Sequence, residues 1–262
     1  MKKSIVAIAV TVLLIAAVLL SGCSAAIIKK EAGPVGTRDY DYTDFTVVEV
    51  GHAFSVEITP AETYRISISA GENAFDHIEV TKTGGKLEIG MDTFFFHFLR
   101  SPRVKITMPR LTGLHLTGAT EGNVTGFSSS DDFDLSLSGA SELYMELETG
   151  NFEGELSGAS ELTGNLVATS CEFTLSGASE MELTGSGGDI KIDASGASQA
   201  DLEHFNANDA DIDFSGASDG NLNVNGRLDI SLSGASLLEY SGSPTLGELD
   251  LSGGSELKNR ED

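Results

Sequence analysis

Apolar and polar residues alternate along most of the chain, in short runs that glycines separate. The clearest runs flank a tetrapeptide, Ser-Gly-Ala-Ser, that recurs through the C-terminal half. Positions one and three before it are usually apolar, as in Leu135 and Leu137, and apolar pairs such as Leu143 and Met145 often follow it. Alternation with a period of two predicts β-strands that bury one face. No segment has the 3.6-residue stripe of an amphipathic helix, so helices are not expected.

The tetrapeptide recurs about every nineteen residues. Successive copies start 21, 19, 19, 19, 20, 18 and 19 residues apart. Two or three short strands with their turns in this length predict one coil of a parallel β-solenoid, whose coils stack ~4.8 Å apart. The alternatives are an antiparallel sandwich and a propeller, whose blades need about twice this period. The exact copies begin at Ser138, Ser157, Ser176, Ser195, Ser215 and Ser233, and degenerate copies begin at Thr117 and Ser252.

Equivalent residues of successive coils are expected to form columns. Columns of Leu and Phe would fill the interior, and Gly and Ala would let the backbone bend tightly at one corner. Ser or Thr occupies the first and fourth motif positions. Because each hydroxyl donates and accepts, we expect a column of them to satisfy its own hydrogen bonds.

Residues 37–116 alternate without the motif, and residues 117–262 form the repeat solenoid. Gly84-Gly85 separates two alternating runs and predicts a hairpin turn. The open edge of a first coil invites aggregation, so we expect 37–116 to start the stack and to cap it. The last four charged residues would blunt the other end: Lys258, Arg260, Glu261 and Asp262. The strands expected before the repeats are 44–50, 54–59, 64–69, 77–81, 86–89 and 103–108.

The N-terminus is typical of an export signal. Two lysines precede an apolar-to-neutral run that ends in Leu20-Ser21-Gly22-Cys23. This ending resembles a bacterial lipoprotein signal, which implies cleavage after residue 22 and a lipid on the Cys23 sulfur. Residues 1–22 are then the signal peptide and 23–36 a tether. The alternative is an uncleaved transmembrane anchor. Both place the remaining chain outside the cytoplasm, with Cys171 as an ordinary buried thiol.

Acidic residues dominate the chain, and nearly all of the excess lies in the repeats. The 40 Asp and Glu residues against 16 Lys and Arg give a net charge of −24. Residues 23–116 carry 12 acids and 10 bases, whereas 117–262 carry 28 acids and 4 bases. Nucleic-acid binding is therefore excluded, because it needs clustered Lys and Arg.

The residue that follows the tetrapeptide is usually acidic. Two unscreened carboxylates ~4.8 Å apart repel by about 0.9 kcal/mol in water, yet such a column is a candidate for weak Ca²⁺ binding. We favour a solvated acidic face that keeps the protein soluble, because Gln199 and Leu237 interrupt the column. The candidate residues are Glu121, Glu142, Glu161 and Glu180.

One aromatic cluster lies outside the repeats. It is expected to plug the N-terminal end of the core, or, if it is exposed, to form a patch that binds a partner. Its members are Phe94, Phe95, Phe96 and Phe98.

No catalytic signature is found. The five histidines have no metal-ligand spacing, and no nucleophile elbow or phosphate loop occurs. A polysaccharide lyase would need a base, but before the C-terminal end the repeats offer only Lys191 and Arg227 among many acids. Paired carboxylates for hydrolysis cannot be singled out. We therefore expect no catalytic residue, no cofactor beyond weak Ca²⁺ and no firm metal site.

The order of strands and repeats resembles the head GIN domain family of putative autotransporter adhesins, over roughly residues 38–256. The resemblance implies a β-solenoid on a secreted protein or lipoprotein and transfers no active site. The quoted strands are 44–50, 54–58, 64–68, 78–80, 86–89 and 104–109, followed by the Ser-Gly-Ala-Ser repeats.

We therefore expect a non-catalytic, structural or adhesin-like lipoprotein, anchored by lipid to the cell membrane or envelope. Its partner would be a cell-surface protein or a glycan, and the pattern leaves its oligomeric state open. The alternative is a glycan-binding or glycan-degrading β-helix protein. The absence of Trp weakens that alternative, because sugar faces commonly stack on aromatic rings.

Overall fold

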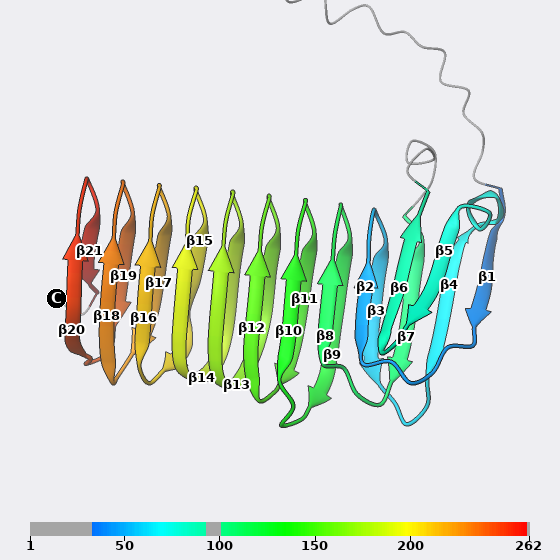
Figure 1. Ribbon diagram of the computed structural model, residues 1–262, viewed down its shortest axis with the longest axis horizontal. Helices are drawn as coiled ribbons and strands as arrows, with labels where there is room; N and C mark the ends of the chain where they lie inside the picture. Colours follow the sequence, from blue (N-terminus) through cyan, green and yellow to red (C-terminus); the bar gives the residue numbers. More distant parts are fainter. Residues whose placement is uncertain (1–32, 93–100, 261–262) are drawn as a thin grey trace, which may run out of the picture. The chain divides into compact units, whose positions relative to one another are not determined.

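The computed structural model describes residues 33–92 and 101–260, which belong to one compact unit spanning 32–262. This unit is a parallel β-solenoid of about eight turns with ~19-residue spacing, as the repeat predicts (Figure 1). The described residues contain no α-helix, only the short 3₁₀ helix η1 (Glu72–Ala74). Within them, no helix has the length and hydropathy needed to cross a membrane.

Each turn of the repeat region contains two strands, with the tetrapeptide between them. Equivalent residues of successive turns pair in parallel, so they stack in columns. The 15-residue strands β13 (Glu161–Leu175) and β14 (Glu180–Ala194) run through the opposite bend and serve two turns each. The strands before the tetrapeptide are β8 (Gly113–Leu116), β10 (Phe133–Leu137), β12 (Asn151–Leu156), β16 (Ala210–Phe214), β18 (Arg227–Leu232) and β20 (Thr245–Leu251). Those after it are β9 (Glu121–Ser128), β11 (Glu142–Glu148), β15 (Gln199–Ala207), β17 (Asp219–Val224), β19 (Leu237–Ser241) and β21 (Glu256–Asn259).

Two further rungs precede the repeats, and their order in space differs from their order in the chain. The rung of β2 (Val47–Val50) and β3 (Ser55–Pro60) lies between β8/β9 and the rung of β6 (Lys86–Met91) and β7 (Arg103–Met108) (Figure 1). The chain therefore leaves the stack after β3, builds a more distant rung, and then returns to β8.

Antiparallel strands surround the distant rung. β4 (Arg65–Gly71) pairs with β7, β1 (Val35–Tyr40) pairs with β4, and β5 (Ile78–Thr83) pairs with β6. The β5–β6 turn is the predicted Gly84-Gly85 hairpin. All six strands expected before the repeats are present within a few residues of their predicted bounds. The additional strand β1 starts at Val35, inside the segment expected to be a tether.

The interior consists of apolar columns whose members compensate one another in size. Gly154 lies in register with Phe173, and a Cβ on this glycine would be 3.0 Å from the Phe173 ring. The absent side chain leaves room for Phe152 and Phe173, whose ring centroids are 5.4 Å apart. The Phe152 ring also stacks on Phe133, at 5.8 Å.

The tetrapeptide turns stack so closely that their glycine column admits no side chain. Gly139 has φ +80°, and a Cβ on it would be 2.6 Å from the Gly118 carbonyl oxygen of the preceding turn. That same oxygen accepts a hydrogen bond from the Ala140 N–H at 2.6 Å. In the rung of β2 and β3 this position is taken by His52, which has φ +83°. Its Nδ1 accepts a hydrogen bond from the Met91 N–H.

The buried hydroxyls of the fourth motif position do not bond to one another, so that expectation is wrong. Ser179 donates to the Ser176 carbonyl at 2.7 Å, and Ser198 donates to the Ser195 carbonyl at 2.8 Å. This carbonyl lies within the same turn, nearer than a hydroxyl in the next turn ~4.8 Å away. The same bond is made by Thr120, Ser141, Ser218, Ser236 and Ser255. Each of these hydroxyls thus closes its own turn, whereas Ser160 donates to the Leu137 carbonyl of the preceding turn at 3.5 Å.

The glycine column gives a first prediction. Gly196→Ala should lower the free energy of unfolding by at least about 2 kcal/mol, because a left-handed residue other than glycine costs about 1–2 kcal/mol and the new Cβ would be 2.5 Å from the Gly177 oxygen. Gly85→Ala is the control, because nothing lies within 4 Å of its Cβ position. Denaturant unfolding measures both variants. Equal losses would contradict the stacking account.

Candidate interaction surfaces

The predicted acidic column is present on the strands that follow the tetrapeptide. Glu142 lies in register with Glu121 on one side and Glu161 on the other, and Glu161 with Glu180. All four side chains are exposed. Within 33–92 and 101–260, no three His, Cys, Asp or Glu side chains are arranged to hold a metal ion. Ca²⁺ binding at this column therefore stays a prediction.

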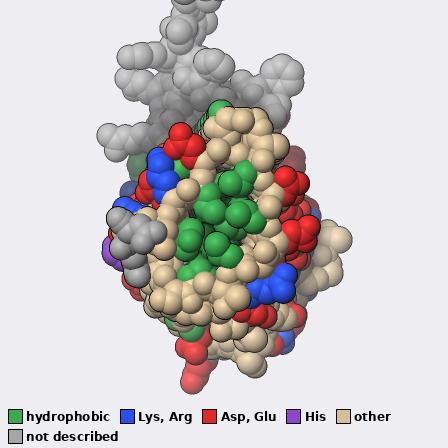
Figure 2. Space-filling model, turned by 90° about the vertical axis from the view of Figure 1, so that its left-hand side faces the viewer, with side chains coloured by type: hydrophobic (Ala, Val, Ile, Leu, Met, Phe, Trp, Pro, Cys, Tyr) green, Lys and Arg blue, Asp and Glu red, His purple; other side chains and the backbone are tan. Residues whose placement is uncertain are grey.

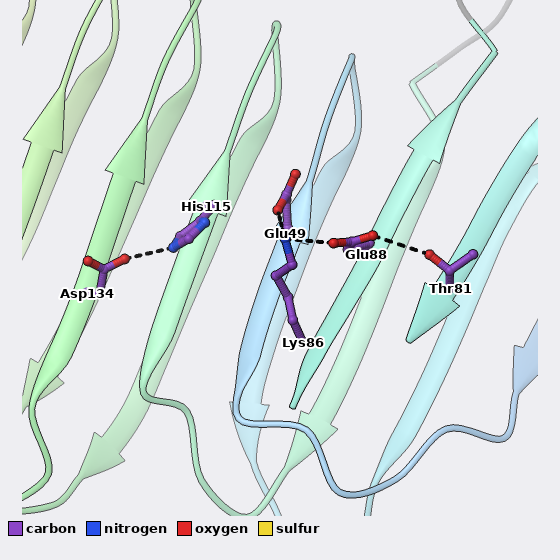
Figure 3. A network of polar contacts seen from close by, with 6 residues as sticks. All are labelled: Glu49, Thr81, Lys86, Glu88, His115 and Asp134. Atoms are coloured by element: carbon purple, nitrogen blue, oxygen red, sulfur yellow. Dashed lines mark hydrogen bonds and ion pairs between the residues drawn. The ribbon is translucent and has the colours of Figure 1, made fainter. Parts of the chain in front are cut away.

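Acids on the N-terminal rungs, in contrast, have basic neighbours. The Lys86 ammonium donates to Glu49 at 2.6 Å and lies 2.6 Å from Glu88 (Figure 3). Both hydrogen bonds raise the pKa of Lys86, and the bond to Glu49 has the larger effect. On the next strands His115 Nε2 lies 2.7 Å from Asp134. The Lys86 ammonium thus offsets acidic charge locally before the repeats.

A groove of about 620 Å³ crosses β10, β12, β13, β14, β16 and β18 near the bend opposite the tetrapeptide. Apolar side chains form its floor, but they expose at most 3% of their surface, as Phe133, Phe152 and Ile190 show. Polar residues two positions apart form its two walls. Its acidic lining residues are Asp132, Asp134, Glu153, Glu172, Asp189, Asp209, Asp211 and Asp229.

The two basic residues that line the groove are paired with acids. Lys191 lies 3.1 Å from Glu172 and 2.8 Å from Asp193. Arg227 donates two hydrogen bonds to Asp229, at 2.6 and 2.7 Å. The guanidinium, together with the Glu248 N–H, lowers the pKa of Asp229 to about 2. The groove therefore carries a strong negative charge that repels uronates and phosphates and admits cationic or neutral chains.

Sequence reasoning missed this groove, although the period contained the signal. Aligning the repeats places Asn151, Ser170 and Asp189 in one column, and every side chain there is polar. The candidate residues were chosen next to the tetrapeptide, whereas the groove is formed by positions near the opposite bend.

Cys171 lies on the floor of the groove as a free, buried thiol. Burial raises its pKa to about 12, so the thiol stays protonated and unreactive at neutral pH. The expected buried cysteine is confirmed. Cys23 and the aromatic cluster of Phe94, Phe95, Phe96 and Phe98 lie outside the described residues.

Residues 44–244 match the family described as "putative auto-transporter adhesin, head GIN domain". No curated protein matches the sequence. Among solved structures, a putative adhesin from Parabacteroides merdae has a TM-score of 0.81 at 13% identity, with 87% of this chain and 97% of that chain covered. The same coverages hold for a putative adhesin from Parabacteroides distasonis (TM-score 0.76, 11% identity) and for a putative lipid binding protein from that species (0.74, 15%). At these identities the neighbours show the fold alone.

The acidic column gives a second prediction. Glu142→Gln should raise the melting temperature by about 2 °C at low ionic strength, because it removes repulsion from two neighbours. The gain should vanish in 1 M salt, where screening acts within about 3 Å. Asp219→Asn is the control, because Gln199 and Leu237 are its register partners.

A Ca²⁺ site would give a different result at the same residue. Wild-type protein would then melt higher in millimolar Ca²⁺ than in Mg²⁺, and Glu142→Gln would abolish that difference. This outcome would contradict the solvated-face interpretation.

Proposed function

Because the chain belongs to the head GIN domain family of putative auto-transporter adhesins, we propose that it is a non-catalytic, adhesin-like lipoprotein of the cell surface. The observation that carries the proposal is the acidic groove. It presents polar residues at intervals of ~4.8 Å across six strands. A regular, elongated surface of this kind suits an extended partner rather than a small substrate.

Attachment to a membrane is supported by the Leu20-Ser21-Gly22-Cys23 sequence. A lipid on Cys23 would tether the solenoid through the short segment before β1. A single lipid chain binds membranes only marginally, so stable anchoring requires the two acyl chains of a diacylglycerol.

The charge of the groove selects the class of partner. Basic segments of a cell-surface protein, or neutral glycans rich in hydroxyls, can lie between its acidic walls. Acidic glycans and nucleic acids are repelled. We do not propose that the groove binds lipid, as the name of one structural neighbour would suggest. Phe133 and Phe152 on its floor are at most 3% exposed and offer a lipid little apolar surface.

The anchor gives a third prediction. Cys23→Ser in the full chain should release the protein from the membrane fraction and abolish incorporation of labelled palmitate. Cys171→Ser should change neither property. Membrane retention of Cys23→Ser would instead indicate the uncleaved transmembrane anchor.

The groove gives a fourth prediction. Glu153→Lys combined with Asp211→Lys should weaken binding to immobilised oligo-arginine at least tenfold, because two of the eight acids that line the groove become bases. Glu182→Lys combined with Asp219→Lys makes the same change in net charge on the opposite sheet. It should bind within twofold of wild type. Equal effects of the two pairs would show that net charge, and not the groove, governs binding.

A further inference from the structure

The C-terminal end of the solenoid leaves its interior uncovered within the described residues. On β20, Leu246, Leu249 and Leu251 are 45%, 48% and 43% exposed, whereas their register partners on β18 are at most 3% exposed. Figure 2 shows this end as an apolar patch ringed by polar and charged side chains. In the described part of the chain, each of β20 and β21 is paired on one side only. We call the three leucines and these two open strand edges the end face.

Of the four charged residues expected to blunt this end, Lys258 and Arg260 do not cover the leucines, and Glu261 and Asp262 lie outside the described residues. Lys258 pairs with Glu256 at 3.1 Å. Arg260 reaches back along the flank to Glu203, at 2.8 Å, and to Glu239, at 3.5 Å. Both cations therefore lie on the side of the stack.

The opposite end is built differently, which limits how copies can associate. There the rung of β6 and β7 is flanked by the antiparallel strands β1, β4 and β5 and by the helix η1. Ala74 and Phe75 at this end are at most 4% exposed. The end face therefore has no matching parallel rung at the other end. Head-to-tail stacking would not continue the solenoid, which leaves the isologous, tail-to-tail contact.

We propose that the end face binds the end face of a second copy, tail to tail. This inference rests on the proposed adhesin-like function and names its partner. A two-fold axis along the strands lays β20 of one copy beside β21 of the other, antiparallel, and so pairs both open edges of each copy. The distance between β20 and β21 is the same in both copies, so both pairs of strand edges can meet at once. The end-face leucines of the two copies then lie together between these strand pairs.

Charge favours the same arrangement. Asp250 on β20 and Lys258 on β21 lie on the outer faces of their strands, so antiparallel pairing brings an acid of one copy close to a base of the other. The two-fold axis repeats the contact. The last rung also carries two of the four basic residues in 117–262, Lys258 and Arg260.

The size of the end face sets the expected strength of the contact. Seven residues of β20 span about 23 Å, and two sheets about 10 Å apart are roughly 20 Å thick with their side chains. The end face is then roughly 450 Å² per copy, or roughly 900 Å² in all, below the 1,200–2,000 Å² typical of stable complexes. Single copies should therefore associate weakly, whereas many copies on two surfaces should bind strongly through multivalency.

The arrangement would join two membranes. β1, where the chain leaves the tether, lies at the end of the stack opposite β20 and β21 (Figure 1). Tail-to-tail pairing therefore places the two anchored ends far apart, as adhesion between cells requires.

The fifth prediction concerns clumping of cells that display the full chain. Leu249→Glu should reduce clumping at least tenfold, because it places a charge in the apolar contact. Val167→Glu is the matched control: Val167 is 40% exposed on β13, away from the end face, and this variant should clump like wild type. Circular dichroism confirms folding, and protease accessibility confirms surface display.

A charge exchange keeps the test decisive if Leu249→Glu misfolds. Cells that display Asp250→Lys alone, or Lys258→Asp alone, should clump severalfold less than wild type, because like charges then face each other. A mixture of the two populations should clump again, because opposite charges are restored between different copies.

Equal clumping of all variants, or clumping with cells that lack the protein, would overturn the tail-to-tail inference. Retained binding of Leu249→Glu to the groove ligands would leave the proposed function standing. Loss of display and of all binding would count against both.

Discussion

The close stacking of the tetrapeptide turns is the constraint on which the rest of the structure depends. Each turn hydrogen-bonds to the turn before it through the glycine carbonyl, as when the Ala197 N–H donates to Gly177 at 2.8 Å. A side chain on the glycine would occupy the space of that carbonyl. Because every turn is held at one distance from its neighbour, the other positions of the repeat also form columns, which register shifts interrupt at a few points, as between Glu182 and Gly185.

These columns explain both the stability and the charge of the protein. Inner columns bury Leu, Ile and Phe. Outer columns repeat whatever polar residue the sequence places there, so a preference for acids becomes an acidic column on one sheet and an acidic groove on the other. Local pairs such as Lys86 with Glu49 are made on the N-terminal rungs, where basic residues are frequent. The repeats carry 28 acids and 4 bases, so most of their charge is left to face the solvent.

The sequence predicted the features that depend on the period and missed those that depend on long-range pairing. The regular spacing of Ser-Gly-Ala-Ser was sufficient to infer the rungs and the register of Glu121 with Glu142. It could not place β2 and β3 between rungs that come later in the chain, because contacts such as Thr46 with Thr112 join residues 66 positions apart. His52 takes a glycine position without any motif to mark it. The partner of each buried hydroxyl and the exposure of Leu249 depend on the packing around them, which no local pattern encodes.

Native-state hydrogen exchange of the turn amides tests the central claim most directly. The account predicts strong protection of the Ala140, Ala159, Ala178 and Ala197 amides, which donate from turn to turn, and weakening protection toward Gly254 on the last rung. Such a gradient is expected of a stack that is stabilised by contacts between neighbouring turns. Exchange of the central turn amides as fast as that of exposed loop amides would contradict the account.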